Sequence, residues 1–190
     1  EIGDFAFSGC KKLKSVTLSK KLEKISSYMF QQCKKLKSIV IPDSVTTIGE
    51  KAFSECASLT SINIPENVLN IEDDAFFDCK ALKSVEIAEG IEDICFGLFS
   101  GCKSLEEIRI PEGVKTIGEC AFCGCSSLKN IILPESLTEI YDNAFNNCPS
   151  LESIVIPKGV VEIGEAAFGG CDLLTDIEIP EGVTVINDSL

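Results

Sequence analysis

Residues 105–125 read LEEIRIPEGVKTIGECAFCGC, and variants of this string recur along most of the 190-residue chain. Leu105 opens a stretch in which Ile108 and Ile110 alternate with charged residues, and Pro111 follows directly. Alternation with a period of two is typical of a half-buried strand, and a proline ends such a strand because it cannot donate a backbone hydrogen bond. The string therefore predicts a short strand followed by a turn.

The repeat has a strict period of 23 residues. One cysteine and one phenylalanine recur at every 23rd residue, the cysteine at Cys10, Cys33, Cys56, Cys79, Cys102, Cys125, Cys148 and Cys171. The period defines eight units, which start at Ile2, Ile25, Ile48, Ile71, Ile94, Ile117, Ile140 and Ile163, and a partial ninth unit at 186–190. We number the positions of a unit from 1 to 23, so that phenylalanine stands at position 6, cysteine at position 9 and proline at position 18.

A unit of this length cannot bury its own apolar face, but stacked units bury a continuous core. Positions 1, 5 and 9 are apolar and four residues apart, which predicts short helices or turns opposite the strand. We expect an α/β repeat fold: one solenoid domain over residues 1–190, with a parallel sheet on the concave face and short helices or turns on the convex face. We also expect the chain to be a fragment of a longer array, because solenoids need capping units at their ends.

The consensus L-x-x-I-x-I-P-x-x-V-x-x-I-G-x-x-A-F-x-x-C resembles the BspA-type leucine-rich repeat, with clear matches at residues 36–56 and 105–125. This resemblance implies a right-handed, curved leucine-rich-repeat solenoid. It also implies a cell-surface or secreted protein that adheres to host matrix proteins or to other bacteria. The chain departs from commoner leucine-rich repeats at position 20, which holds asparagine only at Asn67.

The eight repeated cysteines form one column of equivalent positions. Side chains in such a column lie side by side, whereas a disulfide needs two facing Cβ atoms, so we expect a ladder of buried, reduced thiols. Three further cysteines stand outside the column, at Cys95, Cys120 and Cys123. Cys120 and Cys123 have the spacing of half a zinc site, but a second pair is missing, so we expect no metal centre. Cys123 is predicted to be the most reactive thiol.

Specificity has to come from positions that differ between units, and on the strand these are positions 13 and 16. Position 16 supplies the candidate binding residues, namely Val40, Asn63, Glu86, Arg109, Ile132 and Val155. Arg109, Ile132 and Val155 lie on adjacent strands and are the favoured contact patch, because arginine and desolvated apolar groups dominate interfaces. The alternative is that these side chains are only the solvated side of the sheet.

The charge is uneven along the chain. Residues 1–47 carry nine lysines against four acidic residues, whereas residues 48–190 carry eight basic against 26 acidic residues. The lysines cluster around the first two strands, at Lys11, Lys12, Lys14, Lys34, Lys35 and Lys37. This cluster is either a basic patch for an anionic partner such as a glycan, or a solvated face that discourages edge pairing.

Composition excludes several classes of function. The net charge of −13 argues against non-specific nucleic-acid binding, and no apolar run approaches the ~18 residues that cross a bilayer. The absence of histidine excludes Ser-His-Asp triads, and no other catalytic constellation or cofactor motif emerges. We therefore expect a non-enzymatic module that binds protein, or a glycan, through its concave face. The alternative is a rigid spacer that presents another domain.

Overall fold

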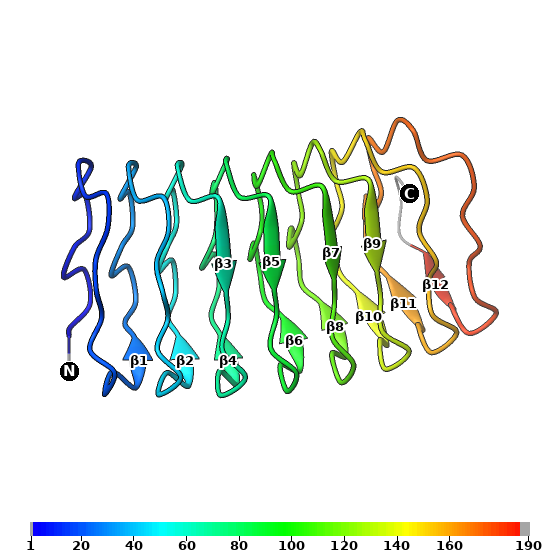
Figure 1. The fold of residues 1–190 in the computed structure, drawn as a ribbon. Helices are drawn as coiled ribbons and strands as arrows, with labels where there is room; N and C mark the ends of the chain where they lie inside the picture. The colour runs from blue at the N-terminus through cyan, green and yellow to red at the C-terminus, as the bar shows by residue number, and fades with distance from the viewer. Residues whose placement is uncertain (1, 187–190) are drawn as a thin grey trace.

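The computed structural model describes residues 2–186 as a stack of similar coils, one for each repeat, which follow one another from blue to red in Figure 1. Short strands recur at two places in the coil. The first row contains two-residue strands at positions 23 and 1: β1 Lys24–Ile25, β2 Thr47–Ile48, β4 Asn70–Ile71, β6 Asp93–Ile94, β8 Thr116–Ile117, β10 Glu139–Ile140, β11 Glu162–Ile163 and β12 Val185–Ile186. The second row contains three-residue strands at positions 14–16: β3 Ser61–Asn63, β5 Ser84–Glu86, β7 Glu107–Arg109 and β9 Asn130–Ile132.

All strand pairs are parallel and join residues one repeat apart. In the first row, Ile25 pairs with Ile48 and Ile48 with Ile71, and a second sheet runs in the order β12-β11-β10-β8-β6. In the second row, β3 pairs with β5 and β7 with β9. The predicted parallel-stranded solenoid is thereby confirmed.

The strand predicted before the proline is present but shorter than expected, with three residues in each of β3, β5, β7 and β9. Positions 14–16 alternate between exposed, buried and exposed side chains, as in Glu107–Arg109, because position 15 points into the core. The same segment in other coils, for example residues 38–40 and 153–155, keeps this alternation without forming a regular ladder. The first row of strands was not predicted, because each strand is only two residues long and its isoleucine was assigned to a helical face.

The segment opposite the strands forms a series of turns, and residues 2–186 contain no helix. In the third unit Ala52 N donates to Gly49 O, Cys56 N to Phe53 O, and the backbone reaches positive φ at Lys51 and Glu55. An L-residue at positive φ cannot continue a right-handed helix, so of the two predicted alternatives, short helices or turns, only the turns form. The remaining N–H groups donate to the next coil, as Phe53 N does to Ala75 O at 2.8 Å.

The core consists of columns that run the length of the stack. The phenylalanines of position 6, from Phe7 to Phe168, stack ring on ring with centroids 5.3–5.6 Å apart. Isoleucines, leucines and cysteines of equivalent positions fill the rest, and most of them are fully buried. No helix among the described residues is long and apolar enough to cross a membrane.

The positive φ of position 4 gives a stability prediction. Ala166 has φ of +51°, where a Cβ atom costs about 1–2 kcal/mol. Ala166→Gly should raise the free energy of unfolding by about 0.5–1 kcal/mol, after subtraction of the entropy that glycine loses on folding. The neighbouring Ala167 is fully buried and is absent from the residues with positive φ, so Ala167→Gly should instead destabilise the protein. Urea denaturation of both variants tests the prediction, and a destabilised Ala166→Gly variant would contradict it.

Candidate functional site

The exposed side chains at positions 14 and 16 form one continuous surface, which we call the strand face. The six residues proposed from the sequence lie on it in successive coils and are all exposed, in the order Val40, Asn63, Glu86, Arg109, Ile132 and Val155. Among them, Val40 and Val155 are each 82% exposed and Ile132 is 60% exposed. Exposed apolar side chains that adjoin one another mark surfaces that contact a partner, whereas single ones, such as Leu69 at 64% exposure, are ordinary.

Arg109, Ile132 and Val155 lie next to one another on the strand face. The other three residues lie on earlier coils and are not part of this group. Arg109 and Ile132 are register partners on β7 and β9, and Val155 occupies the equivalent position of the next coil. Val40 lies four coils before Ile132, which at about 4.8 Å per strand places it roughly 19 Å away. Asn63 and Glu86 pair across β3 and β5 and separate the two apolar groups.

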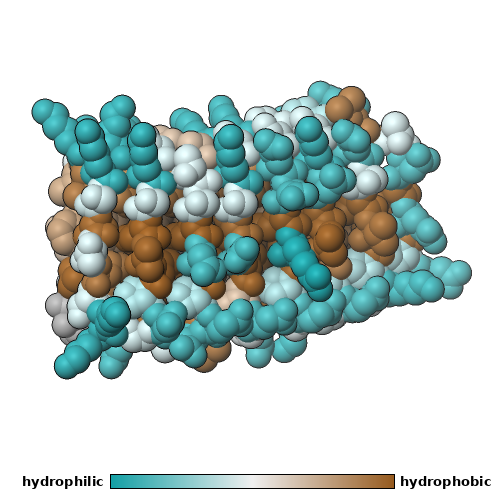
Figure 2. Space-filling view, viewed as in Figure 1, coloured by the Kyte–Doolittle hydropathy of each residue, from teal (hydrophilic) through white to brown (hydrophobic). Residues whose placement is uncertain are grey.

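The strand face has two open depressions, and the one at the first two coils is lined by Thr17, Val40 and Ile41. A shallow depression between β5, β7 and β9 has Glu86, Arg109 and Ile132 at its rim and includes the nearly buried Val85 and Ile108. Figure 2 shows the same side as a hydrophobic band along the stack, crossed by hydrophilic side chains near its middle. Such a surface lacks a deep cavity for a small molecule and suits a broad, extended contact.

The structure places the repeated cysteines in one column, with different exposure at its ends. Cys33, Cys56, Cys79, Cys102, Cys125 and Cys148 are buried, whereas Cys10 is exposed and Cys171 is partly buried. From Cys33 onward, each thiol donates to the carbonyl oxygen of the phenylalanine 26 residues earlier, at 3.1–3.3 Å. Burial raises the pKa of Cys79 to about 12, so its thiol stays protonated. The prediction that the whole column is buried is wrong for Cys10.

The three additional cysteines lie on the turn side of the coils and are partly buried. Burial raises the pKa of Cys120 to about 11, and that of Cys123 also lies above its usual value. Cys123 is thus neither fully exposed nor activated, unlike the reactive thiol predicted from the sequence. Among residues 2–186, no three cysteine or carboxylate side chains gather closely enough to hold a metal ion.

A charged cluster on the turn side was not foreseen from the sequence. Lys51 binds Glu50 at 3.0 Å and the buried Asp74 at 3.2 Å, and Tyr28 donates to Glu50 at 2.5 Å. The hydrogen bond from Tyr28 lowers the pKa of Glu50, and the same bond raises the pKa of Tyr28. These four side chains bind one another through ion pairs and a hydrogen bond. We therefore interpret the cluster as a contact that stabilises neighbouring coils and not as a ligand site.

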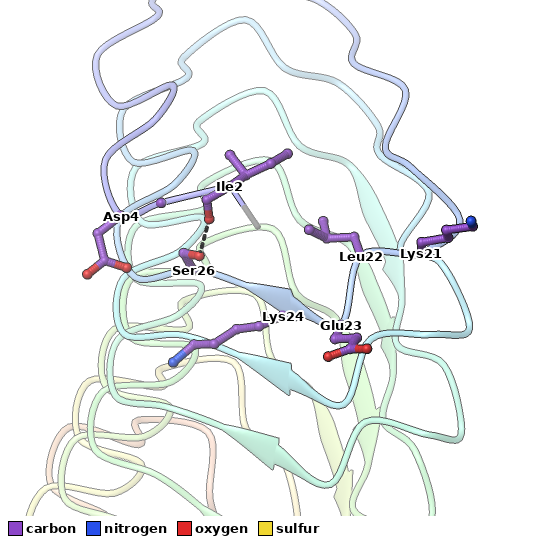
Figure 3. A pocket seen from close by; sticks show the side chains of 8 residues that line it. Ile2, Asp4, Lys21, Leu22, Glu23, Lys24 and Ser26 are labelled. Carbon is purple, nitrogen blue, oxygen red and sulfur yellow. Dashed lines mark hydrogen bonds between the residues drawn. The ribbon is translucent and has the colours of Figure 1, made fainter.

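A cavity at the first coil is lined by Ile2, Gly3, Asp4, Lys21, Leu22, Glu23, Lys24 and Ser26 (Figure 3). Ser26 donates to the carbonyl oxygen of Ile2 at 2.5 Å. Ile2 and Leu22 belong to core columns, at positions 1 and 21. The cavity is therefore the open side of the core at this coil, and its polar groups do not converge on a common point.

A comparison with known protein families identifies the family of this chain. The model of the BspA type leucine-rich repeat region matches residues 1–106 and 92–190, with six copies. The chain belongs to the BspA-type leucine-rich repeat family. The family assignment agrees with the phenylalanine and cysteine columns, since these are the repeated residues on which the resemblance was based. A comparison with curated proteins finds no match.

Solved structures of bacterial repeat proteins share this fold. A leucine-rich cell surface protein from Faecalibacterium prausnitzii is 31% identical over 98% of the BspA-type chain, with a TM-score of 0.64, and the chain spans 59% of that protein. The leucine-rich repeat protein of T. pallidum is 28% identical, with a TM-score of 0.81, and the match covers 92% of this chain and 82% of that one. A leucine-rich repeat protein from Eubacterium ventriosum is 28% identical over 94% of this chain and 45% of its own, with a TM-score of 0.72.

Proposed function

We propose that this BspA-type solenoid is a non-catalytic adhesion module of a cell-surface or secreted protein, and that it binds a partner protein through the strand face. The observation that carries the proposal is the exposure of Ile132 and Val155 beside Arg109 on consecutive coils. Arg109 is the single arginine of the chain, in a protein with 16 lysines. Arginine beside desolvated apolar side chains is the composition of interface hot spots.

Two further observations support this surface over the rest of the molecule. The core columns are nearly identical in every coil and cannot distinguish one partner from another, whereas position 16 differs from coil to coil. The similarity to a protein from Faecalibacterium prausnitzii that is described as a cell surface protein supports an exposed location. Host matrix proteins and proteins of other cells are the partners that such a location offers.

The experiment compares two double variants with equal changes in charge. Arg109→Glu with Ile132→Asp alters the strand face, and Lys158→Glu with Val161→Asp alters exposed residues away from it. The probe is a solubilised preparation of extracellular-matrix proteins freed of glycosaminoglycans by enzymatic digestion. We expect the strand-face variant to lose binding by at least tenfold and the control to bind like the wild type, with both keeping their thermal stability because surface changes cost about 0.5 kcal/mol.

Two results would contradict the proposal. Equal binding by the strand-face variant and the wild type would exclude the strand face as the interface. No binding of the wild-type protein to any component of the preparation would favour the alternative, a rigid spacer, for which the uniform stacked core is equally suited.

A further inference from the structure

The fold gathers the lysines of this acidic protein on one edge. Positions 10, 11 and 13 lie between the cysteine turn and the strand, and in the first six coils they hold ten of the 17 basic residues: Lys11, Lys12, Lys14, Lys34, Lys35, Lys37, Lys80, Lys83, Lys103 and Lys129. All ten are exposed. We call this row the lysine edge. It extends well beyond the cluster seen in the first 47 residues, and it becomes visible only when the coils are stacked.

The opposite edge of the coil carries the opposite charge. Position 19, which follows the proline, is acidic in six of the eight units, and these side chains are exposed: Asp43, Glu66, Glu89, Glu112, Glu135 and Glu181. In the first six coils the lysine edge itself contains a single acidic residue, Glu106. Although the net charge is −13, positive and negative side chains are therefore separated across the coil, and the positive ones lie along one side of the stack.

Most of this positive charge is not neutralised within the chain. Among the described residues, only Lys34 and Lys80 of the edge form ion pairs, with Glu55 at 3.6 Å and with Asp78 at 3.1 Å. The other eight have no carboxylate within 4.0 Å in that part of the chain. At the far end of the edge, Lys83 and Lys129 flank a shallow depression that also includes Asn130 and two acidic residues, Glu106 and Glu107, so the positive charge is weaker there.

The lysine edge has the shape of a line. Successive coils are about 4.8 Å apart, so its six coils extend over roughly 24 Å and present a narrow ridge. A linear polyanion that runs along the stack would meet a lysine at most steps and stay clear of the acidic opposite edge. We propose that the lysine edge is a second binding site, separate from the strand face, and that it binds linear sulfated polysaccharides.

The same residues disfavour other polyanions. Single-stranded nucleic acids are bound by aromatic side chains that stack on the bases, and positions 10, 11 and 13 contain no aromatic residue in any unit. A nucleic-acid duplex or an anionic membrane is broad and would bring its negative charge close to the carboxylates of the neighbouring surfaces. Lysine ammonium groups with adjacent serines, such as Ser104 and Ser127, suit the sulfates and hydroxyls of a sugar chain.

The test is titration calorimetry with heparin oligosaccharides against the whole chain. The edge variant replaces Lys11, Lys12, Lys34 and Lys35 with serine, and the control variant replaces Lys20, Lys21, Lys115 and Lys158, which are exposed and lie off the edge. Both variants lose four positive charges. We expect at least a tenfold loss of heparin affinity in the edge variant and less than a twofold loss in the control. Wild-type affinity should fall steeply as salt rises from about 0.05 M to about 0.3 M, because exposed charges are screened.

Several outcomes would overturn the proposal. These are an equal loss in both variants, equal binding of unsulfated dextran, and tighter binding of single-stranded poly(dT) or of anionic phospholipid vesicles than of heparin. The edge variant should keep its binding to the glycosaminoglycan-free matrix proteins, so failure of this site and failure of the strand face are distinguishable. Circular dichroism of both variants verifies that the coils remain folded.

Discussion

Phe99→Ala is expected to lower the free energy of unfolding by about 3–5 kcal/mol, because the substitution removes a fully buried ring and leaves a cavity. Phe99 stacks on Phe76 and on Phe122, with centroid distances of 5.6 and 5.5 Å. It lies near the middle of the phenylalanine column, so neither neighbour can refill the space without breaking its own stack. A loss of this size is a large fraction of the stability of a typical domain.

The matched control is Phe96→Ala in the same unit, since Phe96 is 43% exposed and should cost far less. Urea denaturation followed by circular dichroism measures both the midpoint and the m value. Contacts in a solenoid are between neighbouring coils, so a weakened coil can uncouple the two halves of the stack and reduce m. Equal stability of the two variants would show that the column is not the main source of cohesion.

The repeat explains why so much of the fold could be predicted. Each position is sampled eight times, so an apolar column such as Phe7 to Phe168 stands out from the variable positions around it. The strand before the proline follows from the alternation at Ile108 and Ile110, and the placement of Arg109 and Ile132 on the exposed side follows from the same period of two. The structure confirms both.

The errors arose where hydrogen bonds between coils override the local pattern. Apolar residues spaced four apart indicate a helix only if the backbone bonds within its own segment, but Phe53 N and Glu55 N donate to the next coil. Positive φ at residues as different as Lys51, Asp74 and Ala166 has no sequence signal of its own. The two-residue strands at positions 23 and 1 exist for the same reason, since only stacking gives them partners.

The candidate surfaces show a similar division. The strand face could be predicted because its residues share one strand position, whereas the lysine edge combines three positions from six coils. In the sequence, only the first part of the lysine edge, Lys11 to Lys37, stands out as a cluster of positive charge. The partner of either surface is not encoded in the repeat, because the residues that hold the fold are the same in every coil.

The thiols are expected to react with a maleimide at rates that differ by about a thousandfold or more within one molecule. Cys10 is exposed and should be labelled first. Cys102 is fully buried, burial holds its pKa well above the usual range, and its thiol donates to Phe76 O at 3.3 Å. A protonated thiol in the core is not a nucleophile, so Cys102 should react only when the stack opens.

Mass spectrometry of peptides after short and long labelling at pH 8 measures these rates for each cysteine. Cys123 should react between the two extremes, because it is partly buried and its pKa is raised. In denaturant all 11 cysteines should be labelled at once, which also counts the free thiols. Disulfides between cysteines of the column, detected without reduction, would contradict the reduced ladder. Labelling of Cys102 as fast as that of Cys10 would instead show that the coils separate readily. That result would also contradict the large contribution to stability that is predicted for the phenylalanine column.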